Sequence, residues 1–581
     1  MRQYTDERQI KQMTEEIWMV QTKKADFTGI AKQFGIDPVT ARIIRNRGIE
    51  GENNINRYLN GTMDALYDPR LMKDMDKAVA ILKEKISGKK KIRIVGDYDI
   101  DGVCSTYILY NAFMRLGAPV DYDIPDRIRD GYGINESIIE KAAEQGIDTI
   151  LTCDNGISAF SQIELAKQKG MTVIVTDHHE VPLGNDGEVL PPADAVIDPK
   201  QSECNYPFPE ICGAVVAWKL VQVLYGECGV PLKEWEELLE FAAIATVGDV
   251  MRLQDENRII VKYGLRRMKQ TKSIGLRKLA GKNNLDLSQI TAYHIGFVIG
   301  PCLNAGGRLQ TAKLALSLLL SRDEEEADRL ATELKELNDM RKDMTEQGTE
   351  AAKAMVDSCY MQDKVLVVYL PECHESLAGI IAGRLREYYQ KPSIVLTQGE
   401  EAVKGSGRSI ESYHMFQKLS EVKELMLKFG GHPMAAGLSL EEQNIEEFRK
   451  RLNENSGLCE DDFKAKVWID VPMPVDYMTE RLIREFHCLE PFGQGNEKPM
   501  FAQKNLRVRN ARVIGRNRNV VKLTLEEQNG FAMEAIYFGD GVSFEEERNG
   551  RRGMDIVYYP EINEYNGNKT LQAVVRRYKF H

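Results

Sequence analysis

The chain has 581 residues, a length that predicts several domains. Its net charge of −11 argues against a protein coated in positive charge, so contact with nucleic acid would need a local basic surface. It shows no signal-peptide region and no bilayer-length apolar run, and its ten cysteines form no C-x-x-C pair, so we expect a cytoplasmic protein with reduced thiols, no membrane segment and no zinc ribbon.

The chain begins with a stretch, residues 1–50, that mixes helical periodicity with polar breaks and predicts a small helical N-terminal segment. Helical signal continues over residues 75–87. A short β-branched run then predicts a buried strand over residues 92–95.

Three carboxylates follow that strand at alternate positions: Asp97, Asp99 and Asp101. Open parallel sheets place their chemistry at the carboxyl ends of strands. Acids crowded there repel one another and resist burial as anions, and a divalent cation resolves both problems. Ligands that are all oxygen suit Mg²⁺ or Mn²⁺. Taken alone, the pattern fits an acidic surface turn or an Asp helix cap equally well.

Strands and helices then alternate, which predicts a mostly parallel α/β sheet. Asp154 follows one of these strands, and Asp177, His178 and His179 follow the next. Because the carboxyl ends of parallel strands are neighbours in space, we expect these side chains to converge with the triple-Asp loop. The predicted strands cover residues 120–124, 148–153, 171–176 and 195–197, and the helices cover residues 136–145 and 158–169.

Residues 206–320 are chiefly helical in pattern. Within them, the run over residues 241–251 is apolar until Asp249, a carboxylate that is costly to bury unless it is paired, bound to metal or used as a helix cap. A glycine-rich turn is predicted at residues 300–309, where Asn304 and Arg308 suit either a phosphate-binding loop or a simple turn.

The next segment, residues 322–357, is long, highly charged and almost free of glycine and proline, which predicts an extended helix bridging two domains. A second α/β unit follows, with strands at 365–370 and 392–397 and a helix at 374–385 that carries Arg384.

Two glycine-rich segments of this second unit favour a phosphate cradle. One presents Ser406 and Arg408, and the other places His432 beside Gly431. Glycine permits close approach of the backbone to a ligand, and amides, arginine and histidine favour an anion. The alternative for the second segment alone is a tight turn.

From about residue 464 the pattern changes to short alternating runs, which predict an all-β module of the OB type. Residues 501–581 hold fourteen Lys and Arg against ten Asp and Glu, with aromatic residues among them. That mixture suits stacking and backbone contact with single-stranded nucleic acid. The alternative is an ordinary barrel core with a solvated basic face.

Taken together, the motifs resemble the DHH phosphoesterase superfamily, and more closely its RecJ-type single-stranded-DNA-specific exonucleases. The resemblance covers residues from about 50 to the end, with small departures at Cys302 and Gly306. The matching segments are GDYDIDG at 96–102, CDNGIS at 153–158, TDHHE at 176–180, ATVGDV at 245–250, GPCLNAGGRL at 300–309, HESLAGIIAGRL at 374–385, GSGRS at 405–409 and GGHPMAAG at 430–437.

The resemblance implies a parallel-sheet DHH domain, a long bridging helix, a second α/β domain of the DHHA1 type and an OB-type domain. The corresponding ranges are 1–50 for the N-terminal segment, 51–321 for DHH, 322–358 for the helix, 359–460 for DHHA1 and 461–581 for the OB domain.

The resemblance also implies two divalent cations, Mn²⁺ or Mg²⁺. Asp99 and Asp101 would each favour one cation, Asp154 would bridge both, and His178 and Asp249 would complete the second site. Asp97 would be a ligand or an outer partner, and Asp177 and His179 would orient the cluster and the scissile phosphate. The residues implied for phosphate binding are Asn304, Arg308, Arg384, Ser406, Arg408, Gly431 and His432.

The implied activity is 5′→3′ hydrolysis of single-stranded DNA to 5′-mononucleotides, in DNA repair and recombination. The substrate would carry a 5′-phosphate, candidate partners are a single-strand-binding protein or a helicase, and a monomer is expected. The alternatives are a phosphodiesterase acting on short oligoribonucleotides or cyclic dinucleotides, and a non-catalytic scaffold. The basic β module and the bridging helix favour the first activity, because a dinucleotide enzyme needs neither.

Overall fold

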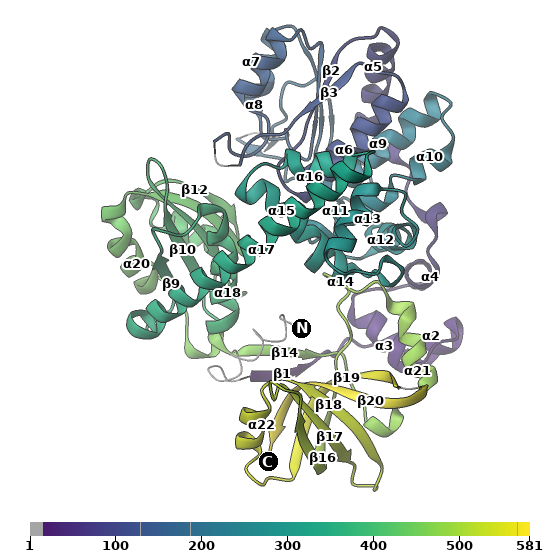
Figure 1. Ribbon diagram of the computed structural model, residues 1–581, viewed down its shortest axis with the longest axis vertical. Helices are drawn as coiled ribbons and strands as arrows, with labels where there is room; N and C mark the ends of the chain where they lie inside the picture. Colours follow the sequence, from purple (N-terminus) through teal and green to yellow (C-terminus); the bar gives the residue numbers. More distant parts are fainter. Residues whose placement is uncertain (1–15, 128, 186, 566) are drawn as a thin grey trace. The chain divides into compact units, whose positions relative to one another are not determined.

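The computed structural model describes residues 16–127, 129–185, 187–565 and 567–581 (Figure 1). The chain forms two compact units. The first unit comprises Glu50–Arg341 with Leu489–Lys498, and the second comprises the chain up to Ile49, Lys342–Cys488 and Pro499–His581. The domain boundaries expected from the sequence, at residues 51, 322, 359 and 461, stay predictions.

The first unit is built on a five-stranded sheet in which every pair is parallel. Its strands are short and completely buried at the centre, as expected for β-branched runs covered on both faces. In spatial order they are β3 (Val120–Asp123), β2 (Ile92–Val95), β4 (Thr149–Cys153), β5 (Thr172–Thr176) and β8 (Ala195–Ile197).

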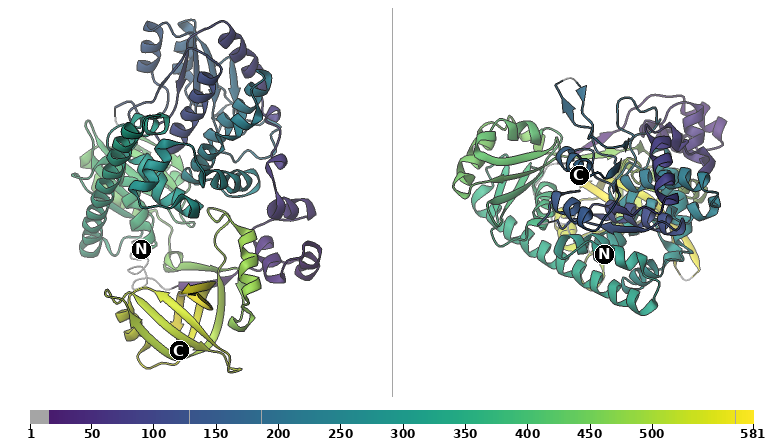
Figure 2. Two further views of the ribbon diagram at one scale, coloured as in Figure 1. Left: turned by 45° about the vertical axis from the view of Figure 1, so that its right-hand side comes forward. Right: turned by 90° about the horizontal axis from the view of Figure 1, so that it is seen from above.

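Helices cover both faces of this sheet (Figures 1 and 2). Successive side chains of a strand point to opposite faces, so Leu151 joins one hydrophobic cluster and Ile150 the other. One cluster includes α5 (Met75–Ser87), α6 (Ile100–Arg115) and α9 (Gly213–Glu227), and the other includes α7 (Glu136–Glu144) and α8 (Phe160–Gln168). The predicted α/β alternation is therefore confirmed.

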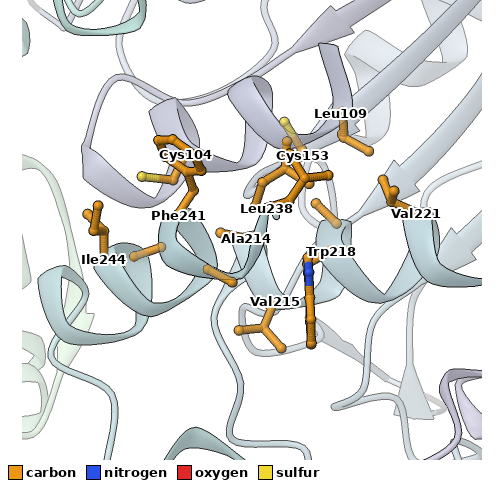
Figure 3. Packing of buried hydrophobic residues seen from close by; sticks show 14 of the residues in the cluster. Cys104, Leu109, Cys153, Ala214, Val215, Trp218, Val221, Leu238, Phe241 and Ile244 are labelled. Atoms are coloured by element: carbon orange, nitrogen blue, oxygen red, sulfur yellow. The ribbon is translucent and has the colours of Figure 1, made fainter. Parts of the chain in front are cut away.

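A layer of helices extends the larger cluster. In it α11 (Leu239–Gly248) packs with α6, α9 and α12 (Asp255–Met268). Figure 3 shows Cys104, Trp218 and Phe241 among the buried side chains of this packing. Trp218 stacks on Trp235, with ring centroids 4.0 Å apart. This packing fixes the end of α11, where Asp249 follows.

The prediction of a glycine-rich turn at residues 300–309 is wrong, because this segment is the helix α15 (Gly300–Leu309). It continues a π-helical turn, Ile295–Ile299, and Pro301, which has no N–H to donate, lies just after the junction between the two. A Cβ on Gly307 would lie 2.3 Å from the carbonyl oxygen of Tyr98. This glycine therefore lets the helix approach the triple-Asp loop closely; it does not turn the chain.

The long helix predicted at residues 322–357 is confirmed as α17 (Glu324–Met355), with 32 residues. It begins in the first unit and ends in the second. Its first turn is acidic, which suits the positive end of a helix dipole. No described helix combines the length and the apolar character needed to cross a membrane.

The second unit contains a mixed five-stranded sheet in which only the β9–β10 pair is parallel. Hydrophobic clusters lie on its two faces, one including α18 (Ala378–Tyr389) and the other α19 (Met415–Ser420) and α20 (Ile445–Glu454). In spatial order the strands are β12 (Met426–His432), β13 (Ala435–Leu440), β11 (Val403–Arg408), β10 (Ser393–Gln398) and β9 (Leu366–Tyr369). The segment with Ser406 and Arg408 is thus a strand.

Five C-terminal strands close into a barrel, because β16 pairs with both β17 and β19. The predicted OB-type module is confirmed, and Figure 2 shows its strongly curved strands in yellow-green. Its elements are β16 (Phe501–Ile514), β17 (Val520–Glu526), β18 (Ala532–Phe538), α22 (Gly541–Arg548), β19 (Gly553–Tyr565) and β20 (Asn568–Phe580).

The described part of the N-terminal segment has helical and extended portions. The helices α2 (Phe27–Phe34) and α3 (Pro38–Asn46) agree with the predicted helical pattern. A strand that the sequence did not predict, β1 (Glu16–Val20), pairs in parallel with β14 (Ala465–Ile469). Its partner lies more than 400 residues away, so no local pattern announces the pairing.

Candidate metal centre

The loop after β2 holds the first carboxylates of the site. Asp99 caps α6, since its Oδ1 accepts hydrogen bonds from the backbone N–H groups of Asp101 (2.9 Å) and Gly102 (3.1 Å). The cap interpretation is therefore correct for one oxygen of Asp99. Asp101 lies buried in the first turn of α6 and accepts hydrogen bonds, both 2.7 Å long, from the N–H groups of Gly213 and Ala214. The beginning of α9 thus holds Asp101 in place.

Asp154 follows β4 in a left-handed conformation, with φ of 61°. This conformation is uncommon for a residue other than glycine and often marks a functional position. Two neighbours hold it. The Tyr132 hydroxyl donates a 2.7 Å hydrogen bond to the Asp154 carbonyl oxygen, and Gly213 lies so close that an added Cβ would be 2.7 Å from the Asp154 Cβ.

The two histidines after β5 have different surroundings. His178 is buried, and its Nε2 lies 3.1 Å from Asp154, 3.4 Å from Asp101 and 3.8 Å from Asp249. His179 places Nδ1 2.7 Å from Asp177, and Asp177 also accepts hydrogen bonds from the backbone N–H groups of His178 and Ile157. Asp177 therefore organises the turn, while His178 faces the carboxylates.

Burial dominates the electrostatics of this cluster. Burial and the charge of Asp99 raise the pKa of Asp97 to about 8, and burial with the charges of Asp101 and Asp99 raises the pKa of Asp249 to about 8. The pKa values of Asp101 and Asp154 are also raised by burial. Acids in this state bind protons unless another positive charge is supplied.

The histidines complement these acids. Burial lowers the pKa of His178, which keeps its imidazole neutral, the form that binds metals. Burial also opposes protonation of His179, but the hydrogen bond and charge of Asp177 outweigh it and raise its pKa to about 9. His179 therefore carries a positive charge at neutral pH, and His178 does not.

The acids and the two histidines form three groups, linked through Asp154 and His178, that suit a pair of cations. Asp97, Asp99 and Asp154 form one group, and Asp101, His178 and Asp249 form another, each with ligand atoms within 4.8 Å of one another. Asp154 also groups with both histidines. Buried carboxylates with raised pKa values and a neutral imidazole fit Mn²⁺ or Mg²⁺. The buried Nδ1 of His178 has no hydrogen-bond partner among the described residues, so that ring is held by packing and by its Nε2 side.

Two predicted phosphate-binding residues lie on α15, in the same unit. Arg308 is half-buried, and burial, with the positive charges of Arg127 and Arg341, lowers its pKa to about 10. The buried amide oxygen of Asn304 has no hydrogen-bond partner among the described residues. Since α15 contacts the backbone of Tyr98 through Gly307, it lies against the triple-Asp loop.

The other predicted phosphate-binding residues lie in the second unit. Arg408 donates a 3.2 Å hydrogen bond to the Ser406 hydroxyl, and an added Cβ on Gly379 of α18 would lie 2.8 Å from both side chains. Arg408 is also in register with Ala435, which is in register with His432. Gly431, next to His432, has φ of 149°, and Arg384 lies on α18. The structure therefore brings Ser406 and Arg408 together beside α18.

Sequence reasoning missed Tyr132. Its hydroxyl lies 3.2 Å from both ring nitrogens of His179 in addition to its bond to Asp154. Burial and the surrounding carboxylates, Asp154 first, raise its pKa, so the hydroxyl keeps its proton. The sequence signal that could have indicated Tyr132 is the pair of glycines on either side of it, Gly131 and Gly133. In the structure both have positive φ, so they shape the loop that presents this tyrosine.

Comparisons with known proteins agree with this architecture. Three family profiles match the chain: the DHH family, N-terminal domain over residues 91–246, the DHHA1 domain over 362–456 and the RecJ OB domain over 469–577. These matches confirm the expected DHH, DHHA1 and OB-type composition.

Curated relatives match over nearly the whole chain. The single-stranded-DNA-specific exonuclease RecJ of Bacillus subtilis is 37% identical over 565 residues, which cover 96% of this chain and 70% of the relative. The RecJ of Haemophilus influenzae is 33% identical over 560 residues, which cover 93% and 95%. Among solved structures, RecJ from Thermus thermophilus in complex with Mn²⁺ superposes with a TM-score of 0.82 at 27% identity, covering 97% of this chain and 79% of that one.

Proposed function

This chain belongs to the RecJ family of single-stranded-DNA-specific exonucleases, and we propose that it hydrolyses single-stranded DNA from the 5′ end and releases 5′-mononucleotides. Its setting would be DNA repair and recombination. The observation that carries the proposal is the position of Asp154 between two adjacent groups of metal-binding side chains.

In this proposal Asp97 and Asp99 would hold one divalent cation, Asp101, His178 and Asp249 would hold the other, and Asp154 would contribute to both sites. The chemistry that Mn²⁺ or Mg²⁺ would supply there is activation of a water molecule and neutralisation of charge on the attacked phosphate. The backbone N–H groups at the start of α9 keep the Asp101 carboxylate oriented.

The second set of roles belongs to Asp177, His179 and Tyr132. Asp177 fixes the imidazole of His179 through Nδ1, so its Nε2 N–H can donate to a phosphate oxygen. The hydroxyl of Tyr132 limits rotation of that ring and supports the left-handed turn at Asp154. Tyr132 is therefore a positioning residue in this scheme.

Phosphate binding is proposed for two sets of residues, one in each unit. In the first unit, Arg308 and Asn304 present a guanidinium and an amide next to the triple-Asp loop. In the second unit, Ser406 and Arg408 form a hydroxyl–guanidinium pair, to which we add Arg384, Gly431 and His432. The second set is the candidate for binding a terminal 5′-phosphate, because the Arg408 fork suits a phosphate dianion.

A barrel of the OB type supports a long substrate over a dinucleotide. OB barrels bind single strands through basic grooves and exposed aromatic rings. Phe531 and Phe538 are exposed at the barrel surface, and the segment from residue 501 carries a positive net charge. An enzyme confined to dinucleotides gains nothing from such a surface.

The test is digestion of one single-stranded DNA in three forms: free ends, a blocked 5′ end and a blocked 3′ end, each with and without Mn²⁺. We expect metal-dependent loss of the free and 3′-blocked strands and protection of the 5′-blocked strand. Faster hydrolysis of a dinucleotide than of the long strand would favour the small-substrate alternative. Equal digestion of all three forms would contradict the polarity.

We further propose a monomeric, cytoplasmic enzyme that works with a single-strand-binding protein or a helicase. The support is indirect: the ten cysteines are free thiols, as expected in a reducing compartment, and an exonuclease for single strands needs a protein that exposes or protects them. Sedimentation of the pure protein, alone and with such a partner, tests the monomeric state and the partnership.

A further inference from the structure

Three arginines of the first unit lie on segments that contact one another near the triple-Asp loop. Arg308 lies on α15, next to Gly307, whose added Cβ would lie 2.3 Å from the Tyr98 carbonyl oxygen. Arg127, in the loop after β3, lies over the Tyr98 ring, and Arg341 lies on α17, which contacts α15 where Asn338 approaches Cys302. Arg127 and Arg341 both lower the pKa of Arg308 through their positive charges. Like charges held close together in a folded protein repel one another, and a bound anion offsets this repulsion because each guanidinium attracts it.

The cluster lies next to Asp99 and Tyr98 of the triple-Asp loop. The charges of both residues act on Arg308 in the opposite sense to the arginines. The guanidinium of Arg127 lies over the Tyr98 ring, 4.8 Å from its centre. The anion that suits this cluster therefore lies beside the metal-binding carboxylates, where a phosphate of the substrate strand has to pass.

Arg341 is held in an unusual way. Its Nε and Nη2 both donate 3.1 Å hydrogen bonds to the amide oxygen of Asn338, one turn earlier on α17. The amide oxygen accepts both bonds and so fixes the direction in which the guanidinium points. Asn338 itself is 1% exposed, so its position is fixed.

The support for Asn338 comes from Cys302, one of the departures from the family pattern. The Asn338 amide nitrogen lies 3.4 Å from the sulfur of Cys302 on α15, and the Asn283 amide lies 3.6 Å from the same sulfur. Cys302 is completely buried. Helix α15, which carries Arg308, is thus connected to Arg341 through Cys302 and Asn338.

We propose that Arg341, oriented by Asn338, is a further phosphate-binding residue of this enzyme. Together with Arg127 and Arg308 it holds a phosphodiester of the substrate strand beside Asp99. This inference rests on the proposed function, since it names a contact that the strand makes at that site. Asn338 is a positioning residue, and Arg341 touches the substrate.

Two variants and one matched control test the inference. Arg341→Gln removes the charge, and Asn338→Asp keeps Arg341 but cancels its charge with a carboxylate. Arg329→Gln is the control, because Arg329 is exposed on the same helix and pairs along the helix surface with Glu333, at 3.3 Å. Thermal unfolding of all three checks that the fold is intact.

Binding is measured by fluorescence anisotropy of a labelled single strand in a chelator, which prevents cleavage, over a series of salt concentrations. Each phosphate contact to a single strand contributes about 0.7 to the slope of log affinity against log salt. We expect both test variants to lose about this amount and the control to lose none. Arg341→Lys should recover the slope, because it restores the charge.

Kinetics with Mn²⁺ give a second readout. Loss of a contact made equally to substrate and transition state raises KM without changing kcat, and loss of a hydrogen bond to a charged group predicts a rise in KM of about tenfold or more. We expect this for Arg341→Gln and not for Arg329→Gln. If Arg341→Gln and Asn338→Asp match the control in slope and KM, the inference is wrong. An unmodified protein with no nuclease activity would instead refute the proposed function, and the binding slopes would still decide the role of Arg341.

Discussion

Gly213→Ala probes the metal centre without removing any of its ligands. In the structure, an added Cβ on Gly213 would lie 2.7 Å from the Cβ, 3.0 Å from the Cα and 3.1 Å from Oδ1 of Asp154. Carbon atoms prefer about 3.5–4.0 Å, so Asp154 or the start of α9 has to shift by roughly 1 Å. Asp154 sits in a constrained left-handed turn, and Gly213 also donates its N–H to Asp101. The shift therefore disturbs both groups of candidate metal ligands.

The expected loss of activity is large for the addition of one methyl group. A misplacement of about 1 Å at a catalytic site can reduce the rate about 100-fold, and overpacking destabilises a fold by about 1–3 kcal/mol. We expect kcat with saturating Mn²⁺ to fall about 100-fold and the Mn²⁺ concentration for half-maximal activity to rise. The assay is release of acid-soluble nucleotide from single-stranded DNA over a Mn²⁺ titration.

The same helix provides the control for this prediction. Gly226 lies near the end of α9, and nothing lies within 4 Å of an added Cβ there. Gly226→Ala should therefore keep full activity and gain about 0.5–1 kcal/mol of stability from the better helix propensity of alanine. If Gly213→Ala retains the activity and the Mn²⁺ response of Gly226→Ala, the close contact with Asp154 does not position the metal ligands.

The remaining predictions concern the ligands, the phosphate and the protons. Asp154→Ala should abolish hydrolysis and spare DNA binding, measured by gel shift; full activity would refute the shared-ligand assignment. Arg408→Ala should weaken the preference for a 5′-phosphate over a 5′-hydroxyl end, and an unchanged ratio of initial rates would count against its role. Asp99→Asn should keep the melting temperature, because asparagine caps helices as well as aspartate does, yet lose activity, while Asp99→Ala should lose both; an active Asp99→Asn variant would leave Asp99 as a cap alone. Finally, Asp97 and Asp249 have pKa values raised to about 8, well above the unfolded value, so the metal-free protein loses stability as pH rises towards 8. Cations compete with those protons, so the increase in melting temperature on adding Mn²⁺ should grow from pH 6 to pH 8, and a constant increase would contradict the pKa assignment.

The sheet and much of the candidate site could be predicted from the sequence because each depends on local pattern. A β-branched run that ends in an acid identifies both a buried strand and the edge where its chemistry lies. This logic placed Asp154 and His178 beside Asp101, and in the structure the Nε2 atom of His178 lies 3.1 Å from Asp154 and 3.4 Å from Asp101. The carboxyl ends of parallel strands lie close together regardless of the sequences of the helices that connect them.

Other features depend on tertiary contacts that no local pattern reports. The glycines of residues 300–309 indicate a turn by composition, yet Gly307 serves the close approach of a helix to Tyr98. Strand β1 exists because β14 offers it an edge. Tyr132 looks like an ordinary surface residue until its loop is placed beside Asp154. The amino-acid composition of a segment therefore does not distinguish residues that make such contacts from residues that do not.

Asp99 shows that a structural and a functional interpretation of one residue can both hold. Its Oδ1 accepts two backbone N–H groups of α6, as an ordinary cap does. A cap alone needs one carboxylate, whereas Asp97, Asp101 and Asp154 are buried around it with raised pKa values. Such crowding destabilises the metal-free fold, and a helix cap gains nothing from it. The cap therefore explains why Asp99 has a fixed orientation, and the surrounding acids explain what that orientation is for.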